Sequence, residues 1–478
     1  MASGIPSAMD RPHFIGIGGA GMSGIAKILA QRGAKVAGSD ARESATAESL
    51  RALGATVHIG HAAEHLADDA TSVVVSSAIR ADNPELVRAA ELGVPVVHRS
   101  DALASLMHTE RPIAVAGTHG KTTTTSMLAV ALSELGLDPS YAIGGDLAGP
   151  GTNARHGEGA IFVAEADESD RSFQKYDPEV AIVLNVELDH HANYASLDEI
   201  YESFEAFVDR IRPGGCLVVG EHSGARELAG RVSGREGLTI VRVGEDVGAD
   251  LRIRQITPKG MTSEVTVVIG AEGDGPGASG EGGTAEELTF TVSVPGRHYA
   301  HNAVAALAAG VRLGVAPADL ARALTAYTGV GRRLQLKGEA RGVQVIDSYA
   351  HHPTEMNADL EALRGAAGED SRILVVFQPH LFSRTQELGT EMGAALALAD
   401  ASVVLDIYPA REDPIPGVTS ALIIDAAAAG GADVRPEHTM AAVPDVIAGM
   451  ARPGDLVLTM GAGDVTDLGP RILARLES

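Results

Sequence analysis

Short apolar runs alternate with helical stretches through the first part of the chain. Buried strands are predicted at His13–Gly18, Ala34–Gly38, Ser72–Ser76 and Val94–Val97, and helices at Gly21–Gln31, Ser44–Ala52, Pro84–Leu92 and Arg99–Met107. Strands and helices that alternate in this way form parallel sheets through right-handed crossovers. The pattern therefore predicts a first α/β domain over residues 1–110.

The same alternation returns in two further segments. Later strands are predicted at Pro112–Ala116, Gly159–Ala164, Val180–Asn185, Val343–Asp347, Ile373–Gln378, Ser402–Asp406 and Leu456–Met460, and helices at Lys121–Leu135 and Leu197–Ile211. Met261–Ile269 and Leu288–Val294 alternate with period two, which predicts paired strands, while the acidic stretch Gly270–Glu287 between them is typical of a mobile surface loop. We predict a central domain over residues 111–329 and a third over residues 330–478.

Composition excludes several classes of protein. The chain has 478 residues and a net charge of −25, which argues against binding the anionic backbone of nucleic acids. No apolar stretch is long enough for a membrane span, and residues 1–13 do not read as a secretory signal. The single cysteine, Cys216, cannot form an internal disulfide, which fits a reducing cytoplasm. No sequence feature defines an oligomeric state.

A glycine-rich loop follows the first predicted strand. Gly16–Gly24 reads GIGGAGMSG and contains G-x-G-x-x-G at Gly16, Gly18 and Gly21. Glycines allow a tight turn, and the free N–H groups of the following helix favour a diphosphate. Asp40 follows the second strand, where a partner for a ribose hydroxyl is expected. This motif by itself is typical of dinucleotide binding.

A second glycine loop carries a stronger signal. Residues 116–125 read AGTHGKTTTT directly after a predicted strand. Backbone N–H groups and Lys121 are expected to hold the β- and γ-phosphates of a triphosphate, with the Thr122 hydroxyl on Mg²⁺. Gly117 lies three residues before Gly120, which is closer than in the common phosphate-loop pattern. We predict an ATP site at this loop.

Carboxylates follow the next two strands of the central domain. Residues 165–170 read EADESD, and residues 185–191 read NVELDHH. Ligands collect at the carboxyl ends of strands in open parallel sheets, so oxygen ligands there suit a metal ion. Further polar clusters are RHYAHN (297–302), GRR (331–333), DSYAHHPT (347–354) and FQPHLFSRT (377–385). They predict a third domain that closes over ATP and an amine substrate.

Taken together, the motifs resemble those of the Mur ligase family over the whole chain. GIGGAGMSGIA, SSAI, AGTHGKTTTT, EADESD, GRR, HHPTE, FQPH and GAGD carry the match in that order. The resemblance implies an N-terminal Rossmann-like domain that binds a UDP-sugar, a central P-loop ATPase-like domain with a mostly parallel sheet, and a C-terminal Rossmann-like domain that binds an amino acid. The implied activity joins L-alanine to the lactyl carboxylate of UDP-N-acetylmuramate with ATP, in cytoplasmic peptidoglycan precursor synthesis.

The resemblance also assigns roles to individual residues. The UDP-sugar is then bound by Gly18, Gly19, Ala20, Gly21, Asp40, Ser76, Ser77 and His119. ATP is bound by Gly117, Thr118, His119, Gly120, Lys121, Thr122, Thr123, His298, Asn302 and Arg333. Two ions, Mg²⁺ or Mn²⁺, are held by Thr122, Glu165 and His190. The amino acid contacts Tyr349, His351, His380 and Arg384, and the catalytic set is Lys121, Glu165, His190 and Arg333.

The sequence departs from the family pattern at four positions and leaves three alternatives open. The departures are Ala192, Tyr299, Ser348 and Leu381, with Asp347 as a substitute for the missing carboxylate. The nearest alternative is a ligase that attaches a murein tripeptide to the same nucleotide sugar, although the first glycine loop favours alanine. A nicotinamide dehydrogenase explains the first loop but not the second. A non-catalytic nucleotide-binding relative is the third.

Overall fold

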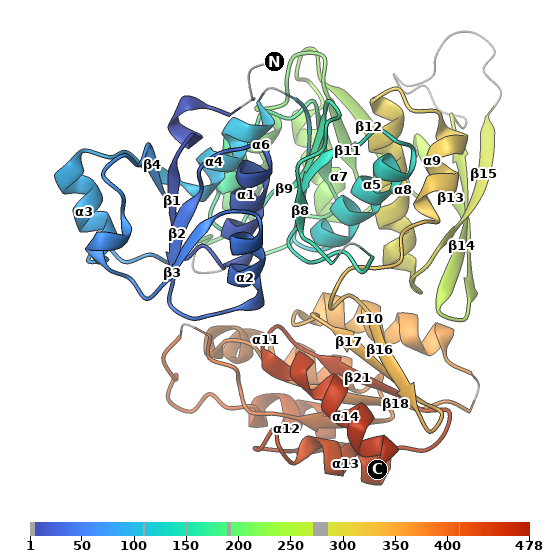
Figure 1. The fold of residues 1–478 in the computed structure, drawn as a ribbon. Coiled ribbons are helices and arrows are strands. Elements are labelled where there is room, and N and C mark those ends of the chain that lie inside the picture. Colours follow the sequence, from blue (N-terminus) through green and yellow to red (C-terminus); the bar gives the residue numbers. More distant parts are fainter. Residues whose placement is uncertain are drawn as a thin grey trace. The chain divides into compact units, whose positions relative to one another are not determined.

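The computed structural model describes the chain in two compact units (Figure 1). The described residues are 5–108, 110–149, 151–188, 193–270, 285–368, 370–410 and 412–478. The first unit consists of Met1–Arg254, Thr266–Phe290 and His301–Tyr327. The second unit consists of Gln255–Val265, Thr291–Ala300 and Thr328–Ser478.

The first sheet has five parallel strands in the order β3-β2-β1-β4-β5. Its strands are β1 (Pro12–Ile15), β2 (Ala37–Asp40), β3 (Thr56–Ile59), β4 (Ser72–Val75) and β5 (Val96–His98). Its helices are α1 (Ala20–Gln31), α2 (Ala45–Ala52), α3 (Pro84–Leu92) and α4 (Arg99–Met107). Local capping sets the helix starts, because the side chains of Ser44 and Asn83 accept hydrogen bonds from the first turns of α2 and α3.

A buried hydrogen-bond network centred on Glu85 holds the first glycine loop through the backbone of Ser39. The fully buried carboxylate of Glu85 accepts a hydrogen bond from the Ser39 hydroxyl at 2.6 Å and lies 3.2 Å from Nε2 of His13. The backbone carbonyl of Ser39 in turn accepts hydrogen bonds from the N–H groups of Gly16 and Ile17. The Glu85 network therefore connects the start of α3 to the turn that follows β1.

Replacing Glu85 with alanine is expected to lower the stability of the first unit by about 3 kcal/mol, because it leaves buried polar partners without their acceptor. Burial opposes ionisation, but hydrogen bonds from His13 and Ser39 outweigh it and lower the pKa of Glu85 below its ordinary value of 4.5. This stabilisation is therefore complete above that value and is lost as the pH falls through the lower folded pKa.

Thermal unfolding of wild type and Glu85→Ala, followed from about pH 7 down to about pH 3, tests this expectation. The difference between the two unfolding midpoints should shrink at the acid end. Glu91→Gln is the matched control, because Glu91 lies on the same helix, is exposed and pairs only with Arg88 in the described contacts. A constant difference across the pH range would contradict the assigned role of the carboxylate.

The second sheet has ten strands in the order β15-β14-β13-β12-β11-β10-β6-β9-β7-β8. Its strands are β6 (Arg111–Ala116), β7 (Ser140–Ala142), β8 (Ala154–Arg155), β9 (Ile161–Glu165), β10 (Val180–Val183), β11 (Cys216–Val219), β12 (Thr239–Gly244), β13 (Leu251–Lys259), β14 (Thr262–Ile269) and β15 (Glu286–Val292). Its helices are α5 (Lys121–Glu134), α6 (Leu197–Val208), α7 (Ser223–Val232), α8 (Arg297–Arg312) and α9 (Pro317–Leu324). Within this order, β12, β11, β10, β6, β9 and β7 pair in parallel, so their carboxyl ends share one edge, whereas β8 is antiparallel to β7.

The third sheet has six strands in the order β16-β17-β21-β18-β19-β20. Its strands are β16 (Gln335–Ala340), β17 (Val343–Ser348), β18 (Ile373–Phe377), β19 (Ala401–Val404), β20 (Val434–Pro436) and β21 (Leu456–Met460). Its helices are α10 (Pro353–Ala366), α11 (Phe382–Leu396), α12 (Ala421–Ala429), α13 (Val443–Met450) and α14 (Leu468–Glu477). All pairs except β16–β17 are parallel.

The three sheets confirm the predicted fold class of three α/β parts in series, with mostly parallel sheets. β14 and β15 are neighbours, as their period-two pattern predicts, while most of the acidic loop between them, residues 271–284, lies outside the described residues. The domain boundaries near residues 110 and 330 stay predictions. Among the described residues, no helix has the length and apolarity that crossing a membrane requires.

Candidate active site

The second glycine loop joins β6 to α5 at the carboxyl edge of the central sheet. Gly117 and Gly120 have φ angles of +133° and +86°, which side chains rarely adopt. A Cβ atom on Gly120 would also lie 2.8 Å from Oδ1 of Asn302. Asn185, at the end of β10, holds the loop by accepting from the His119 N–H at 2.8 Å and donating to the His119 carbonyl at 3.0 Å. The free N–H groups of α5 therefore face a fixed, glycine-lined turn.

Lys121, the first residue of α5, has its ammonium group inside this turn. Nζ donates to the carbonyl of Gly117 at 2.6 Å and to Oε1 of Glu168 at 2.8 Å. Burial would lower the pKa of Lys121, but the carboxylates of Glu168 and Asp167 outweigh it and raise this pKa. The side chain is thus a fixed cation at the loop, as the sequence predicts.

Thr122 and Glu165 form a pair of oxygen donors beside this cation. The Thr122 hydroxyl donates to Oε1 of Glu165 at 2.8 Å, and the N–H of Gly144 donates to the other carboxylate oxygen. A Cβ atom on Gly144 would lie 2.6 Å from that oxygen, so a larger residue there would displace the Glu165 carboxylate. Hydroxyl and carboxylate oxygens at the end of a strand fit Mg²⁺. Thr123 is buried in α5, and Thr118 accepts from the Glu187 N–H at 3.0 Å.

The third predicted metal ligand, His190, lies with Ala192 in residues 189–192, which are outside the described residues. The histidine of the second glycine loop, His119, is among the described residues. Its Nε2 lies 3.4 Å from Glu187, and His222 contacts the same carboxylate at 3.0 Å. Hydrogen bonds from both histidines lower the pKa of Glu187 well below its usual range.

Carboxylates of the acidic segment EADESD, residues 165–170, pair with two different cations, Lys121 and Arg99. Glu168 faces Lys121, while Asp167 lies 3.1 Å and Asp170 3.5 Å from the guanidinium of Arg99 at the start of α4. Burial opposes ionisation of Asp167, but Lys121 and a hydrogen bond from Ser169 outweigh it and lower the pKa of Asp167 to about 2. No motif assigns a role to Arg99, since an arginine at a helix start has no pattern that distinguishes it from a surface residue.

Arg99 also lies against the first glycine loop. A Cβ atom on Gly21 would be 3.0 Å from Nη1 of Arg99, so the cation sits beside the start of α1. In the same loop, the N–H of Gly18 donates to Oδ2 of Asp40 at 2.8 Å. A cation next to a helix N-terminus is a favourable setting for a diphosphate.

Four other residues predicted for the UDP-sugar, Gly19, Ala20, Ser76 and Ser77, follow β1 or β4. Gly19 is the N-cap of α1, which begins at Ala20. Ser76 and Ser77 directly follow β4, and the Ser77 hydroxyl donates to Asp170 at 3.3 Å. The structure thus brings the predicted UDP-sugar residues other than His119 to the carboxyl ends of β1, β2 and β4, while His119 lies in the second glycine loop, after β6.

The polar residues of α8 have separate neighbours. His298 lies 3.4 Å from Asp359 in the second unit. Tyr299, one of the four departures, is buried, and its ring lies 4.2 Å from the His298 ring. Asn302 lies against Gly120 in the first unit. His301, which the sequence analysis did not assign, lies 3.0 Å from Glu245 and 3.7 Å from Glu221.

The residues predicted for the amino acid form a row in the second unit. The ring centroids of Tyr349 and His351 are 5.3 Å apart, and those of His351 and His380 are 5.8 Å apart. Nη1 of Arg384 lies 3.5 Å from Nδ1 of His380. The Arg333 guanidinium lies 5.2 Å from the Tyr349 ring centroid. The structure therefore brings four predicted amino-acid contacts and one predicted phosphate contact together.

His351 is held in a neutral form within this row. Burial lowers the pKa of His351 to about 4. Nδ1 lies 2.9 Å from the carbonyl oxygen of Tyr349, which can only accept, so Nδ1 carries the proton. Nε2 is consequently an acceptor at neutral pH, which suits it to the N–H groups of an amine.

Two departures change the local bonding of the third sheet. The Ser348 hydroxyl donates to Asp359 and accepts from the N–H of Ala350, so it stabilises the turn after β17. Asp347, expected to replace the missing carboxylate, is fully buried and accepts hydrogen bonds from Thr459 and Thr466. The structure therefore gives Asp347 an internal role and brings Asp359 to Ser348 instead. Leu381 has φ +74° and ψ 138°, which strains the turn before α11.

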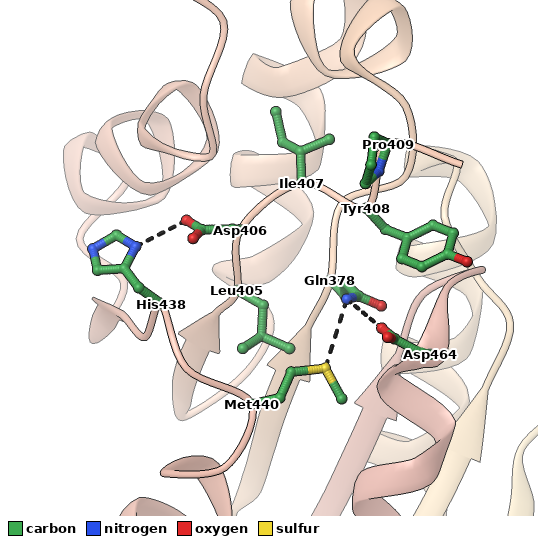
Figure 2. A pocket seen from close by; sticks show the side chains of 9 residues that line it. All are labelled: Gln378, Leu405, Asp406, Ile407, Tyr408, Pro409, His438, Met440 and Asp464. Atoms are coloured by element: carbon green, nitrogen blue, oxygen red, sulfur yellow. Dashed lines mark hydrogen bonds and ion pairs between the residues drawn. The ribbon is translucent and has the colours of Figure 1, made fainter. Parts of the chain in front are cut away.

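A cavity of about 220 Å³ lies at the carboxyl ends of β18 and β19 (Figure 2). Gln378 forms part of its wall, and its amide is fixed by Asp464 at 2.7 Å and by the N–H of Val465 at 3.0 Å. Tyr408 lines the same cavity, and its ring lies 5.9 Å from that of His380 with an angle of 14°. No sequence motif indicates Tyr408, because a lone tyrosine after a strand is not distinctive.

Comparisons with known proteins agree with this geometry. The descriptions "Mur ligase family, catalytic domain", "Mur ligase middle domain" and "Mur ligase, glutamate ligase domain" match residues 11–111, 115–310 and 332–463. The chain belongs to the Mur ligase family.

Within this family, the chain is similar over nearly its whole length to individual ligases. The chain is 78% identical to UDP-N-acetylmuramate–L-alanine ligase of Streptomyces avermitilis, over 100% of this chain and 99% of that protein. The crystal structure of UDP-N-acetylmuramate–alanine ligase from Thermotoga maritima has a TM-score of 0.78 at 28% identity, over 97% of this chain and 98% of that one. A murein peptide ligase from Psychrobacter arcticus shares the fold, with a TM-score of 0.69 at 24% identity, over 98% and 99%.

Proposed function

We propose that this chain joins L-alanine to the lactyl carboxylate of UDP-N-acetylmuramate and converts ATP to ADP and phosphate. The observation that carries the proposal is the cluster of Lys121, Thr122 and Glu165 at the glycine loop, in a chain 78% identical to a ligase of that name. We further infer that the chain acts in the cytoplasmic synthesis of peptidoglycan precursors, which the resemblance of its motifs to those of the Mur ligases implies.

A carboxylate must be activated before an amine can attack it. A lactyl carboxylate oxygen attacks the γ-phosphorus of ATP, the bond to the β-phosphate oxygen breaks, and ADP leaves from an acyl phosphate. The alanine nitrogen then attacks the acyl carbon, a C–N bond forms, inorganic phosphate leaves, and the nitrogen loses a proton. In-line phosphoryl transfer of this kind depends mainly on positioning and on neutralising charge.

The residues of the first unit supply that positioning. Lys121 and the N–H groups of α5 hold the β- and γ-phosphates, while Asn302 lies beside the same turn for the adenine. Thr122 and Glu165, together with His190, would hold two ions, either Mg²⁺ or Mn²⁺. Such ions neutralise the negative charge that gathers when a carboxylate meets a phosphoryl group.

Arg99, Gly18 and Asp40 provide the setting for the UDP part of the sugar nucleotide. Ser76 and Ser77 complete the predicted UDP-sugar contacts. In the second unit, Arg384 offers a cation for the carboxylate of alanine, and the neutral His351 offers Nε2 to its amine. Arg333, 3.5 Å from Glu355, is the predicted contact of the transferred phosphate.

ADP release with UDP-N-acetylmuramate tests the proposal, with L-alanine, glycine, L-serine and a murein tripeptide each supplied as the amine. The expected result is release with L-alanine and much slower release with the tripeptide. Release with the tripeptide alone would replace the proposal by the tripeptide ligase. ATP binding without turnover on any amine would favour a non-catalytic protein, and NAD binding without ATP binding would favour a dehydrogenase.

A further inference from the structure

The row of rings at the predicted amino-acid contacts does not end at His380. Tyr408 continues it, with its ring nearly parallel to that of His380. The same tyrosine belongs to the wall of the cavity described above, which lies at the carboxyl ends of β18 and β19 (Figure 2). Tyr408 therefore contacts the His380 ring and also lines the adjacent cavity.

Backbone pairing fixes Tyr408 against the loop that carries His380. The N–H of Tyr408 donates to the carbonyl of Pro379 at 2.8 Å, and the N–H of Leu381 donates to the carbonyl of Tyr408 at 3.0 Å. These two bonds enclose His380 on both sides along the chain. The tyrosine ring and the histidine ring are thus held in register by the main chain.

The Tyr408 side chain also packs on the GAGD loop, residues 461–464. A Cβ atom on Gly463 would lie 2.7 Å from Cγ of Tyr408, so the backbone of that glycine touches the ring. The Gly463 carbonyl accepts a hydrogen bond at 3.0 Å from Arg332, whose guanidinium lies 4.8 Å from the Tyr349 ring centroid. Tyr408 is therefore connected through Gly463 and Arg332 to Tyr349, the first ring of the row.

The segment after Tyr408 fixes the helix that carries Arg384. The Glu412 carboxylate accepts hydrogen bonds from the N–H of Ser383 at 3.0 Å and from its hydroxyl at 2.5 Å. Ser383 is in the first turn of α11, one residue before Arg384. Tyr408 and Glu412 thus support two predicted amino-acid contacts from one short stretch of chain.

We propose that Tyr408 is a positioning residue of the amino-acid site, which acts by holding the His380 ring. The proposal rests on the proposed function for the identity of the amino acid. Without the tyrosine ring, His380 loses the aromatic neighbour on its cavity side and gains space in which to rotate. Because aromatic pairs stabilise such an arrangement only moderately, we expect about a tenfold rise in the KM for L-alanine.

The variants that test this are Tyr408→Ala, Tyr408→Leu and Tyr408→Phe. Phenylalanine keeps the flat ring, so its KM for L-alanine should stay near the wild-type value. Leucine fills much of the volume but has no flat face. The KM of Tyr408→Leu for L-alanine should therefore rise as much as that of Tyr408→Ala. The KM values for ATP and for UDP-N-acetylmuramate should not change in any of the three.

The matched control is His438→Ala. His438 lines the same cavity but is 71% exposed and is paired with Asp406 rather than with the ring row. It should leave all three KM values unchanged. Equal KM values for L-alanine in wild type, Tyr408→Phe and Tyr408→Leu would overturn the proposal, even if Tyr408→Ala fails to fold.

A second readout does not require turnover. The ring resonances of His380, assigned by comparison with His380→Gln in histidine-labelled protein, should shift in Tyr408→Leu and much less in His438→Ala. Unshifted His380 resonances would contradict the positioning role whatever the substrate is. A shift in a protein that releases no ADP with L-alanine would instead contradict the proposed function and leave the ring contact established.

Discussion

Replacing Lys121 with methionine is expected to lower the rate of ADP release about 10³-fold while UDP-N-acetylmuramate binding stays close to wild type. Removing one preorganised group from a charged transition state typically costs about 10²–10³ in rate. Lys121 is held by the Gly117 carbonyl and by Glu168, and residues 117–125 contain no other lysine and no arginine that could replace it. The fall in kcat should therefore reach about 10³.

The charge balance of the site needs its own control, because Lys121→Met also removes the cation beside Glu168. The double variant Lys121→Met with Glu168→Gln restores that balance and should remain inactive. Lys259→Met, which removes an exposed lysine paired with Glu264, should behave as wild type. Calorimetry with the UDP-sugar and a coupled ADP assay supply the two readouts. Turnover near the wild-type rate in Lys121→Met would remove the loop from the mechanism.

Glu165→Gln is expected to lower kcat about 10²-fold and to move the Mg²⁺ dependence of turnover to higher concentration. The amide oxygen can still accept the N–H of Gly144, so the fold of the loop is retained. What is lost is the negative charge next to the Thr122 hydroxyl, 2.8 Å away. A weaker metal site with an intact loop should follow.

The control for this variant is Glu158→Gln, which changes an exposed carboxylate just before β9, the strand that Glu165 ends. Its activity and Mg²⁺ dependence should match wild type. Titrations of Mg²⁺ and Mn²⁺ at saturating substrates measure the effect. An unchanged metal dependence in Glu165→Gln would move the metal to other ligands.

Much of this fold was predictable because its strands are buried and its motifs sit at strand ends. β1 and β6 are almost wholly buried, so their sequences read as apolar runs followed by glycine loops. β3 was missed because its four residues, TVHI, are exposed or half-buried and have no apolar pattern. α7 was also missed, since Gly224 and Gly230 weaken its helical pattern.

The candidate site was predictable where a motif implies its own geometry. The contacts of Lys121 and of the Thr122–Glu165 pair follow from a phosphate loop between a strand and a helix. Arg99 and Tyr408 could not be found in this way, because their roles depend on segments that only the fold brings near. Asp347 shows that a carboxylate at a strand end can be occupied by internal hydrogen bonds, here from Thr459 and Thr466, so its part in the amino-acid site stays a prediction.

The backbone of Leu381 has a consequence for how far this enzyme can be stabilised. A side chain held at φ +74° and ψ 138° costs about 1–3 kcal/mol, and that cost is borne by folding. Leu381→Gly should therefore raise the melting temperature, yet it would also free the turn that aims His380 and Arg384. The same substitution is thus expected to increase heat resistance and to weaken the affinity for the amino acid.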